Sequence, residues 1–188
     1  MNPPLAILGG TFDPVHNAHL AIARHALGAL GCGRVLWIPT GAPAYRAAPV
    51  ASAAQRLAML RLALGGEPRH AIDERELAPG RSGYTVDTLI ALRAETHSKT
   101  PIVLLLGADQ YAKLETWVRW RDLVKLCRIA VFGRPGSPAP QGEALRVAMP
   151  PLAISASDIR ARIARGEDVS AMLPAPVLGY IREHKLYR

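Results

Sequence analysis

Apolar and polar positions follow two alternating patterns along most of the chain. Short apolar runs, typical of buried strands, are separated by longer segments in which apolar residues recur at helical spacing. Strands are expected at residues 5–8, 35–38, 71–72, 102–106 and 129–132. The helical pattern is carried by Leu20, Ala23, Leu27 and Leu30, then by Leu57, Leu60 and Leu64, and then by residues 86–94. This alternation predicts an α/β fold, a Rossmann-like parallel sheet with helices on both faces.

The last part of the chain predicts a C-terminal helical segment. A short strand is expected at 152–154, a helix at about 157–165 ended by Gly166, and a final helix opened by Pro176. Residues 39–52 and 133–142 are rich in proline or glycine and predict long connections, and loops as long as the first are often functional lids. No internal repeat is visible, so residues 1–188 are expected to form one domain.

The composition fits one sizeable core and an anionic ligand. Of the 188 residues, 49% are hydrophobic and 20% are charged, and 23 Lys plus Arg against 15 Asp plus Glu give a net charge of +8. Such a charge attracts phosphorylated substrates or nucleic acid. The basic residues are scattered and only 5% of the chain is aromatic, so a dedicated nucleic-acid groove is the weaker interpretation.

The cysteines and the apolar runs bear on where the chain works. Cys32 and Cys127 have no spacing typical of a metal site or a disulfide framework, so we expect both in the core and the chain in a reducing cytoplasm. The run at 102–106 is far too short to cross a bilayer, and no basic segment precedes the first apolar run as in an export signal. Neither membrane insertion nor export is expected.

The first candidate for chemistry is the segment GGTFDPVHNAHL, residues 9–20, which joins the first strand to the first helix. Ligands of open parallel sheets bind at this edge. Gly9 and Gly10 let a bulky anion approach the backbone, and Asn17 is expected to cap a helix whose N-terminus attracts that anion. His16 and His19 flank the cap and can donate ring N–H groups to phosphate oxygens.

Each of these features has a simpler explanation when taken alone. A Gly-Gly pair is a common turn, and one histidine near a helix start is more often structural than catalytic. The H-x-x-H spacing is also half of a zinc site, with Asp13 the only nearby third ligand. The combination at one strand-to-helix turn favours phosphate binding, and we expect no protein ligand to a metal.

The second candidate is ISASDIR, residues 154–160. Ser155 and Asp158 stand at capping-box spacing, and Ser157 is an alternative cap. Arg160 is expected in the first helical turn, where a cation opposes the helix dipole. An anion shared by the helix end and the guanidinium would remove that conflict. Without such an anion, Arg160 is an ordinary solvated arginine.

Together the two segments resemble the HxGH nucleotidyltransferases. In that family two histidines at a strand-to-helix turn, and the serine and arginine of an I-S-x-x-x-I-R segment, hold the phosphates of ATP. Ala18 replaces the glycine between the histidines and leaves both imidazoles in place. The resemblance implies catalytic roles for His16, His19 and Arg160. The ATP site that it implies consists of Gly9, Gly10, Thr11, Phe12, His16, His19, Ser155 and Arg160.

Segments in the middle and at the end of the chain resemble, more narrowly, the nicotinate mononucleotide adenylyltransferases. These segments are DERELAPGRSGYTVDTL, LLLGADQYAKLETWVRW and LPAPVLGYIREHKLYR. In that family a Tyr-Thr pair and a tryptophan form the pyridine pocket. The substrate-binding residues implied by the resemblance are Arg46, Tyr84, Thr85, Asp109, Trp117 and Arg134.

Three of these assignments have open alternatives. Trp117 and Trp120 stand one helical turn apart, so one can face the core and the other a cleft. Asp109 can instead cap a helix. The family usually shows Pro-Pro-His-Lys in its mobile loop, where this chain reads Ala-Tyr-Arg at residues 44–46. Arg46 keeps the cation, but the change leaves the detail of loop closure open.

The resemblance implies in-line attack by the phosphate of nicotinate mononucleotide on the α-phosphorus of ATP. Pyrophosphate leaves, and Mg²⁺ is carried by the ATP phosphates. Nicotinamide mononucleotide and phosphopantetheine are alternative acceptors. A basic module that binds nucleotides or nucleic acid without catalysis is the alternative from another class, but it leaves both phosphate sites unexplained. The expected partners are ATP and nicotinate mononucleotide, with no nucleic acid or membrane, and the oligomeric state, a homo-oligomer included, stays open.

Overall fold

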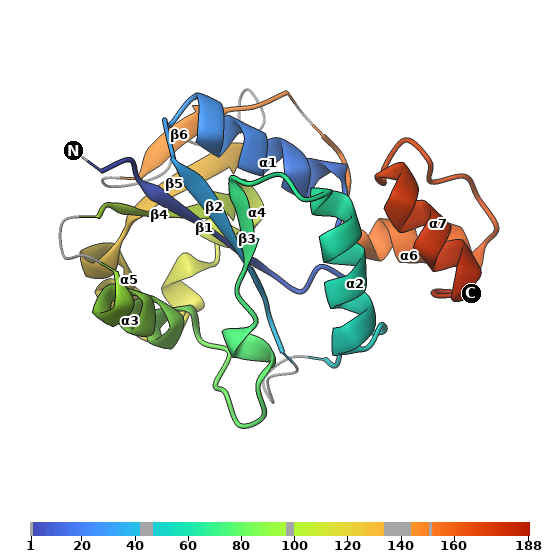
Figure 1. Ribbon diagram of the computed structural model, residues 1–188, viewed down its shortest axis with the longest axis horizontal. Coiled ribbons are helices and arrows are strands. Elements are labelled where there is room, and N and C mark those ends of the chain that lie inside the picture. The colour runs from blue at the N-terminus through green and yellow to red at the C-terminus, as the bar shows by residue number, and fades with distance from the viewer. Residues whose placement is uncertain (1, 42–46, 97–99, 134–143, 151) are drawn as a thin grey trace.

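Six parallel strands form the centre of the molecule, in the order β3-β2-β1-β4-β5-β6 (Figure 1). The structure is a computed structural model that describes residues 2–41, 47–96, 100–133, 144–150 and 152–188. The strands are β1 (Leu5–Gly10), β2 (Arg34–Pro39), β3 (His70–Ile72), β4 (Ile102–Gly107), β5 (Arg128–Gly133) and β6 (Leu145–Ala148). This strand order is the doubly wound arrangement of Rossmann folds, so the predicted fold class is confirmed.

Helices connect the strands and cover both faces of the sheet. The α-helices are α1 (Asn17–Gly28), α2 (Ala53–Leu64), α3 (Thr85–Glu95), α4 (Ala108–Tyr111), α5 (Trp120–Leu126), α6 (Ala156–Ala164) and α7 (Ala175–Glu183), with short 3-10 helices η1 (Arg75–Leu77) and η2 (Leu114–Thr116). Figure 1 shows α3 and α5 together on the left of the view, and α6 and α7 together on the right.

Alternate residues of β1 show why the strands read as continuous apolar runs. Ala6 and Leu8 belong to a cluster that includes side chains of α1, α2, α6 and α7, whereas Ile7 belongs to a second cluster built with α3, η2 and α5. Neighbouring residues of a strand point to opposite faces, and both faces are covered. Full burial of one such aliphatic side chain contributes about 1.5–3 kcal/mol. The apolar run therefore replaces an alternating pattern.

The sixth strand lies where the sequence pattern does not predict it. It spans Leu145–Ala148 rather than residues 152–154, and Leu152 is exposed. Of its residues only Val147 is buried, while Arg146 and Ala148 are exposed. An edge strand has one neighbour and little covered surface, so it carries a weak apolar signal. The prediction of a strand at 152–154 was wrong for that reason.

Of three predicted helix starts, the structure changes that of α1 and agrees with those of α6 and α7. His16, not Asn17, caps α1, with extended backbone at φ −144° and ψ 171°. Asn17 is the first helical residue, and its side-chain amide donates to the carbonyl oxygen of Ala171 at 3.0 Å. The predicted Ser155 cap of α6 is confirmed, since its hydroxyl accepts from the backbone N–H of Asp158 at 3.2 Å. Pro176 lies in the first turn of α7, as predicted.

The sheet order defines the edge at which a ligand is expected. Connections from β1 run to one side through β2 and from β4 to the other, so the order reverses between β1 and β4. In open parallel sheets, ligands bind at the carboxyl ends of the two strands between which the order reverses. Both cysteines are free and buried, as predicted. Among the described residues, no helix has both the length and the apolar character needed to cross a membrane.

A buried arginine on α2 ties two strand ends together at this edge. Arg56 is only 2% exposed, and its Nη1 donates to the carbonyl oxygens of Thr11 at 2.6 Å and Thr40 at 2.8 Å. Thr11 follows β1 and Thr40 follows β2. Burial lowers the pKa of Arg56, while the negative charge of Asp13 opposes that shift. Arg56 thus satisfies backbone carbonyls that have left the sheet ladder.

We predict that Arg56→Met lowers the free energy of unfolding by about 2–4 kcal/mol, because methionine keeps an unbranched apolar stem but leaves two carbonyls unpaired. Denaturant unfolding measures the change. Arg61→Met, on the same helix, is the matched control. The Arg61–Glu74 pair is 62% and 48% exposed, and an ion pair that exposed contributes at most about 1 kcal/mol. Equal effects of the two substitutions would contradict the structural role of Arg56.

Candidate active site

The two glycines that end β1 differ in their surroundings: there is open space above Gly9 but not above Gly10. A Cβ built on Gly9 would meet no heavy atom within 4 Å, whereas one on Gly10 would lie 3.0 Å from the ring of Phe12. Gly9 therefore leaves room for a ligand against the backbone, as expected. At Gly10 the missing side chain makes room for the ring of Phe12, and its contact with ATP stays a prediction.

Phe12 is itself a strained part of this loop. Its φ is +50° and its side chain is 2% exposed. A left-handed conformation at a residue other than glycine costs of the order of 1–3 kcal/mol and persists where the surroundings enforce it. The ring packs edge-on against His19, with centroids 5.1 Å apart, and contacts Trp37 at 5.5 Å. This contact thereby restricts the orientation of the His19 ring.

His16 and His19 lie face to face at the start of α1. Their ring centroids are 3.7 Å apart with an interplanar angle of 21°. The backbone N–H of His16 donates to Nδ1 of His19 at 3.2 Å. A ring nitrogen that accepts a hydrogen bond carries no proton, so in neutral His19 the proton is on Nε2. The geometry presents His19 Nε2–H as a donor of fixed orientation.

Both imidazoles are held in the neutral form. Burial lowers the pKa of His16 from 6.5 to about 4. Burial also lowers the pKa of His19 well below its ordinary value, and the neighbouring His16 adds to that shift. Nδ1 of His16 is buried and has no hydrogen-bond partner among the described residues. The pair therefore offers N–H donors to an anion without carrying a fixed charge in the free protein.

Arg160 reaches this loop from the other end of the chain. It is the fifth residue of α6, just past the first turn in which it was expected. Its Nη1 donates to the backbone carbonyl oxygen of Asp13 at 2.7 Å, and its side chain stays 30% exposed. The exposed part of the guanidinium can bind an anion. The fold therefore brings Arg160 to the loop that holds His16 and His19.

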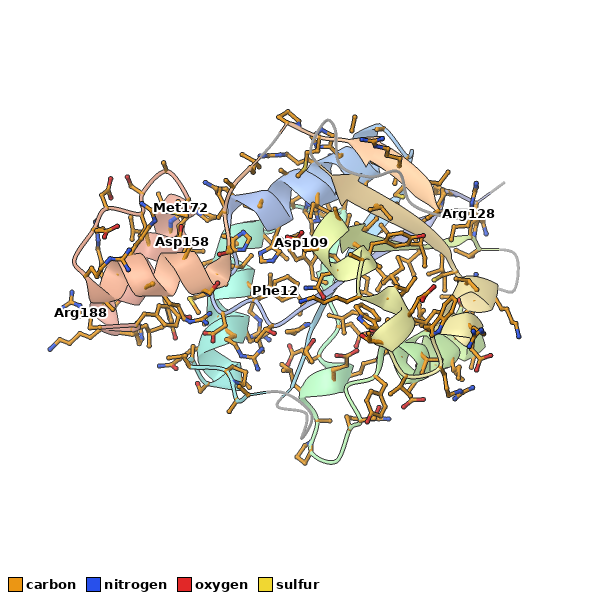
Figure 2. All side chains as sticks on the ribbon, turned by 180° about the vertical axis from the view of Figure 1, so that it is seen from behind. Phe12, Asp109, Arg128, Asp158, Met172 and Arg188 are labelled. Atoms are coloured by element: carbon orange, nitrogen blue, oxygen red, sulfur yellow. The ribbon has the colours of Figure 1, made fainter. Side chains whose placement is uncertain are left out.

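The start of α6 lies close to this guanidinium along the chain. Ser155 is exposed, and its hydroxyl lies 3.2 Å from that of Ser157. The carboxylate of Asp158 pairs with Nε of Arg162 at 2.9 Å rather than with the cap, so the capping box is not closed. Figure 2, seen from behind, shows Asp158 on α6 at one side of Phe12, with Asp109 on α4 at the other.

Asp13 connects the segments around the histidines. It is 3% exposed, and its Oδ2 accepts from the backbone N–H of Val50 at 2.8 Å. Its Oδ1 accepts from the N–H of Ala51 at 3.1 Å and from the hydroxyl of Tyr187 at 2.7 Å. This carboxylate, the candidate third ligand of a zinc site, instead accepts three hydrogen bonds. Among the described residues there is no group of three His, Cys, Asp or Glu arranged to hold a metal ion.

Sequence reasoning missed three members of this arrangement. Asp13 was considered only as a metal ligand, although its position in the TFDP stretch gave a signal that it belonged to the site. Tyr187 lies in the KLYR ending that carries part of the family resemblance. Arg56 has no local signal, because an arginine in a helix is usually exposed.

Tyr84 and Trp117, which are expected to hold the acceptor, lie on the other face of the sheet. Tyr84 caps α3, Thr85 is its first residue, and Asp109 is the second, exposed residue of α4. Tyr84 and Trp117 are half-buried and pack against the cluster that contains Leu106 of β4. An ion pair between Arg119 and Asp87, 3.9 Å apart, links the Trp117 segment to the start of α3. These elements meet near the carboxyl end of β4.

Two expectations about this region change. Trp117 and Trp120 do not lie on one helix, because Trp117 follows η2 and Trp120 begins α5. Both are half-buried and pack against the same cluster, so neither is wholly core. The residue that caps α4 is Gly107 rather than Asp109. Arg46 and Arg134 lie outside the described residues.

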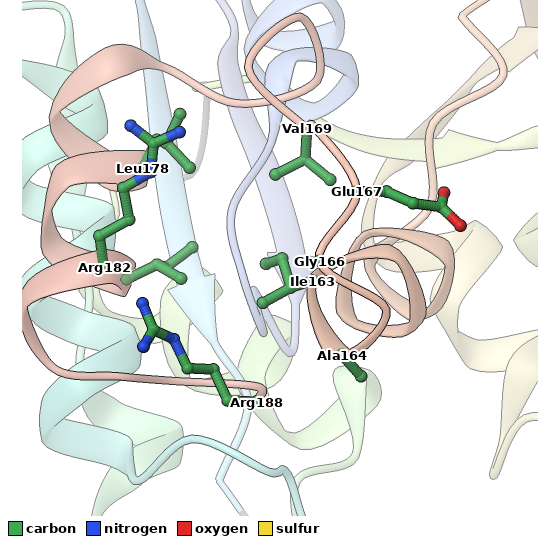
Figure 3. A pocket seen from close by; sticks show the side chains of 9 residues that line it. Ile163, Ala164, Gly166, Glu167, Val169, Leu178, Arg182 and Arg188 are labelled. Carbon is green, nitrogen blue, oxygen red and sulfur yellow. The ribbon is translucent and has the colours of Figure 1, made fainter.

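A pronounced hollow in the described part of the chain lies elsewhere. It has a volume of about 420 Å³ and lies between α6 and α7, where Arg182 and Arg188 border an apolar floor that includes Val169 and Leu178 (Figure 3). None of the predicted site residues lines it. We place the candidate site at the carboxyl end of β1 instead, because the His19 donor and the partly exposed guanidinium of Arg160 lie there.

Comparisons with known proteins show which family the chain resembles. The family model described as cytidylyltransferase-like matches residues 7–162. A protein of Dechloromonas aromatica is 40% identical, with 100% of this chain and 99% of the relative covered, and one of Bordetella petrii is 44% identical, with 98% of each covered. Both carry the name "Probable nicotinate-nucleotide adenylyltransferase".

The fold has a solved counterpart as well. The Plasmodium falciparum nicotinic acid mononucleotide adenylyltransferase, complexed with NaAD, aligns with a TM-score of 0.85 over 99% of this chain and 98% of that chain. The two sequences are 16% identical, so this likeness concerns the fold. The matched family model and the full-length relatives establish the family. The chain belongs to the cytidylyltransferase-like family and, within it, to the nicotinate-nucleotide adenylyltransferases.

Proposed function

We propose that this chain transfers the adenylyl group of ATP to nicotinate mononucleotide, which forms nicotinate adenine dinucleotide and pyrophosphate in NAD biosynthesis. The full-length identity to relatives named for this activity, 40% and 44%, supports the acceptor. The single observation that carries the chemistry is the contact of Arg160 with Asp13, in the loop that joins β1 to the stacked His16 and His19 at the start of α1.

The reaction is a direct displacement. A phosphate oxygen of the mononucleotide forms a bond to the α-phosphorus of ATP, and the bond from that phosphorus to the bridging oxygen breaks. The electron pair leaves with pyrophosphate. Because the attacking phosphate is already ionised, no base is needed, and catalysis rests on positioning and on stabilising negative charge.

The phosphate-binding roles follow from donors and open space. The Nε2–H of His19 and the exposed guanidinium of Arg160 stabilise charge on the transferring group and on departing pyrophosphate. His16 completes the donor pair. The backbone of Gly9, Gly10, Thr11 and Phe12, together with Ser155 at the start of α6, lines the rest of the proposed ATP site. Of the two glycines, Gly9 has clear space above its Cα for the nucleotide.

The acceptor roles follow from the start of α3. The unpaired N–H groups of a helix N-terminus attract a carboxylate, and the Thr85 hydroxyl stands beside them at the first helical position. The half-buried indole of Trp117 offers a face for the pyridinium ring. Tyr84 borders the same pocket, and Asp109 accepts from a hydroxyl of the substrate. Arg46 and Arg134 are further proposed contacts to phosphate or ribose.

The wider assignments are part of the same proposal. Mg²⁺ reaches the site on the ATP phosphates, whose charge it neutralises, since the nearest buried carboxylate, Asp13, already accepts three hydrogen bonds. The partners are ATP and nicotinate mononucleotide rather than nucleic acid. Residues 1–188 form one catalytic domain in this proposal, and the protein acts in the cytoplasm.

A chromatographic assay tests the function directly. Purified protein is given ATP and magnesium with nicotinate mononucleotide or nicotinamide mononucleotide in separate reactions. Dinucleotide formed from the acid at much higher kcat/KM than from the amide is expected. Product mainly from the amide would overturn the acceptor pocket around Thr85 and Trp117, and no product from either would overturn the proposed reaction.

His19→Ala and Arg160→Ala are each expected to lower kcat by about 10²–10³-fold, because each removes a donor aimed at charge that develops in the transition state. Steady-state kinetics measure the loss, and unchanged thermal unfolding shows that the fold is intact. Arg162→Ala is the matched control, since Arg162 lies two residues further along α6 and pairs with Asp158 instead. Near-normal turnover in either site variant would remove that residue from the mechanism.

Stability is expected to fall as the pH drops from 6.5 towards 4. His16 takes up a proton near pH 6.5 when unfolded but only near pH 4 when folded. Unfolding therefore binds a proton in this window, and the stability present above pH 6.5 is lost below it, by about 3 kcal/mol for this group. Denaturant unfolding at several pH values checks the result. His16→Gln is expected to flatten the pH dependence, and an unchanged slope in that variant would contradict a buried neutral His16.

A further inference from the structure

Four polar donors surround the carboxylate of Asp13, three at hydrogen-bond distance and one further away. Three of them, the N–H groups of Val50 and Ala51 and the hydroxyl of Tyr187, lie 2.7–3.1 Å from its oxygens. The fourth, Nη1 of Arg160, lies 3.9 Å from Oδ2, beyond hydrogen-bond distance. The same nitrogen is instead 2.7 Å from the backbone carbonyl oxygen of Asp13. Arg160 is thus kept beside an opposite charge without a close ion pair.

This arrangement matters because Arg160 has two anions to choose between. A buried carboxylate with free oxygens would bind the guanidinium strongly, since charge-assisted pairs of this kind are short and often use two hydrogen bonds. The triphosphate of a nucleotide would then have to displace that carboxylate. Donors that occupy the Asp13 oxygens reduce this competition and leave the 30% exposed guanidinium available.

Tyr187 is the only side chain among these three close donors. It is 8% exposed, and burial followed by its hydrogen bond to Asp13 raises the pKa of its hydroxyl, which therefore stays protonated and donates. The backbone is left-handed at two residues of this turn, with φ +52° at Lys185 and +66° at Tyr187. Left-handed conformations at such residues mark places where the surroundings impose a conformation.

The rest of the C-terminal turn does not explain this placement. The next residue, Arg188, lines the open hollow between α6 and α7 (Figure 3). Tyr187 packs into the cluster that also holds Phe12 and Val15 of the loop between β1 and α1. A phenylalanine would fill that space equally well. The hydroxyl therefore has a purpose beyond packing.

We propose that Tyr187 is a positioning residue for adenylyl transfer: by donating to Asp13, it keeps the Asp13 carboxylate from closing onto Arg160 and so leaves Arg160 free to bind the triphosphate. This inference rests on the proposed function for the identity of the nucleotide. Its physical content, the competition between Asp13 and a polyphosphate for Arg160, does not depend on the acceptor.

Tyr187→Phe tests the proposal. Without the hydroxyl, Oδ1 of Asp13 keeps one donor, and the carboxylate turns towards Arg160. We expect the KM for ATP and the Kd for inorganic tripolyphosphate, measured by calorimetry with magnesium, to rise about tenfold, the effect of one hydrogen bond to a charged group. The KM for nicotinate mononucleotide is expected to stay unchanged. Tyr180→Phe is the matched control, since Tyr180 on α7 stacks on His184 and has no contact with Asp13 in the described structure.

A double-mutant cycle separates this role from a structural one. If Tyr187 acts through Arg160, Tyr187→Phe has no further effect on tripolyphosphate affinity in an Arg160→Ala background. An equal loss in both backgrounds, or a lower Tm with unchanged affinity in the single variant, would overturn the proposal. A wild-type protein that binds tripolyphosphate, responds to Tyr187→Phe as expected and yet makes no dinucleotide would instead refute the proposed function alone.

Discussion

The buried carboxylate of Asp13 is the contact on which the arrangement of the candidate site depends. Burying an isolated carboxylate costs several kcal/mol, so it has to be met by donors. Here the donors come from the loop before α2 and from the last turn of the chain, while Arg160 of α6 is held by the carbonyl of the same residue. Segments from the start, the middle and the end of the sequence are therefore fixed to one another at the carboxyl end of β1.

Charge around this point is distributed so that an incoming anion meets little resistance. The two histidines are neutral because they are buried, and they bring donors without a fixed positive charge that would itself be costly to bury. The cation of the site, Arg160, stays partly exposed, whereas Arg56 is buried and donates its hydrogen bonds to backbone carbonyls. The net charge of +8 adds a long-range attraction for phosphate groups.

The sequence predicts well what depends on local pattern. Strands β1, β2, β4 and β5 are covered on both faces, so their apolar runs are clear, and His16, His19 and Arg160 belong to segments whose residue types already point to phosphate. It fails where the deciding partner is distant. Strand β6 has too little buried surface to be recognised, the space beside Gly10 is taken by the ring of Phe12, and the contacts of Asp13 become visible only when Tyr187, 174 positions away, is placed beside it.

The most direct test of the account is a crystal structure of the protein with magnesium and an ATP analogue that cannot be cleaved between the α- and β-phosphates. The triphosphate is expected above Gly9, with oxygens at about 2.7–3.2 Å from Nε2 of His19 and from the guanidinium of Arg160. A triphosphate held between α6 and α7 by Arg182 and Arg188, or at the amino ends of the strands, would contradict it.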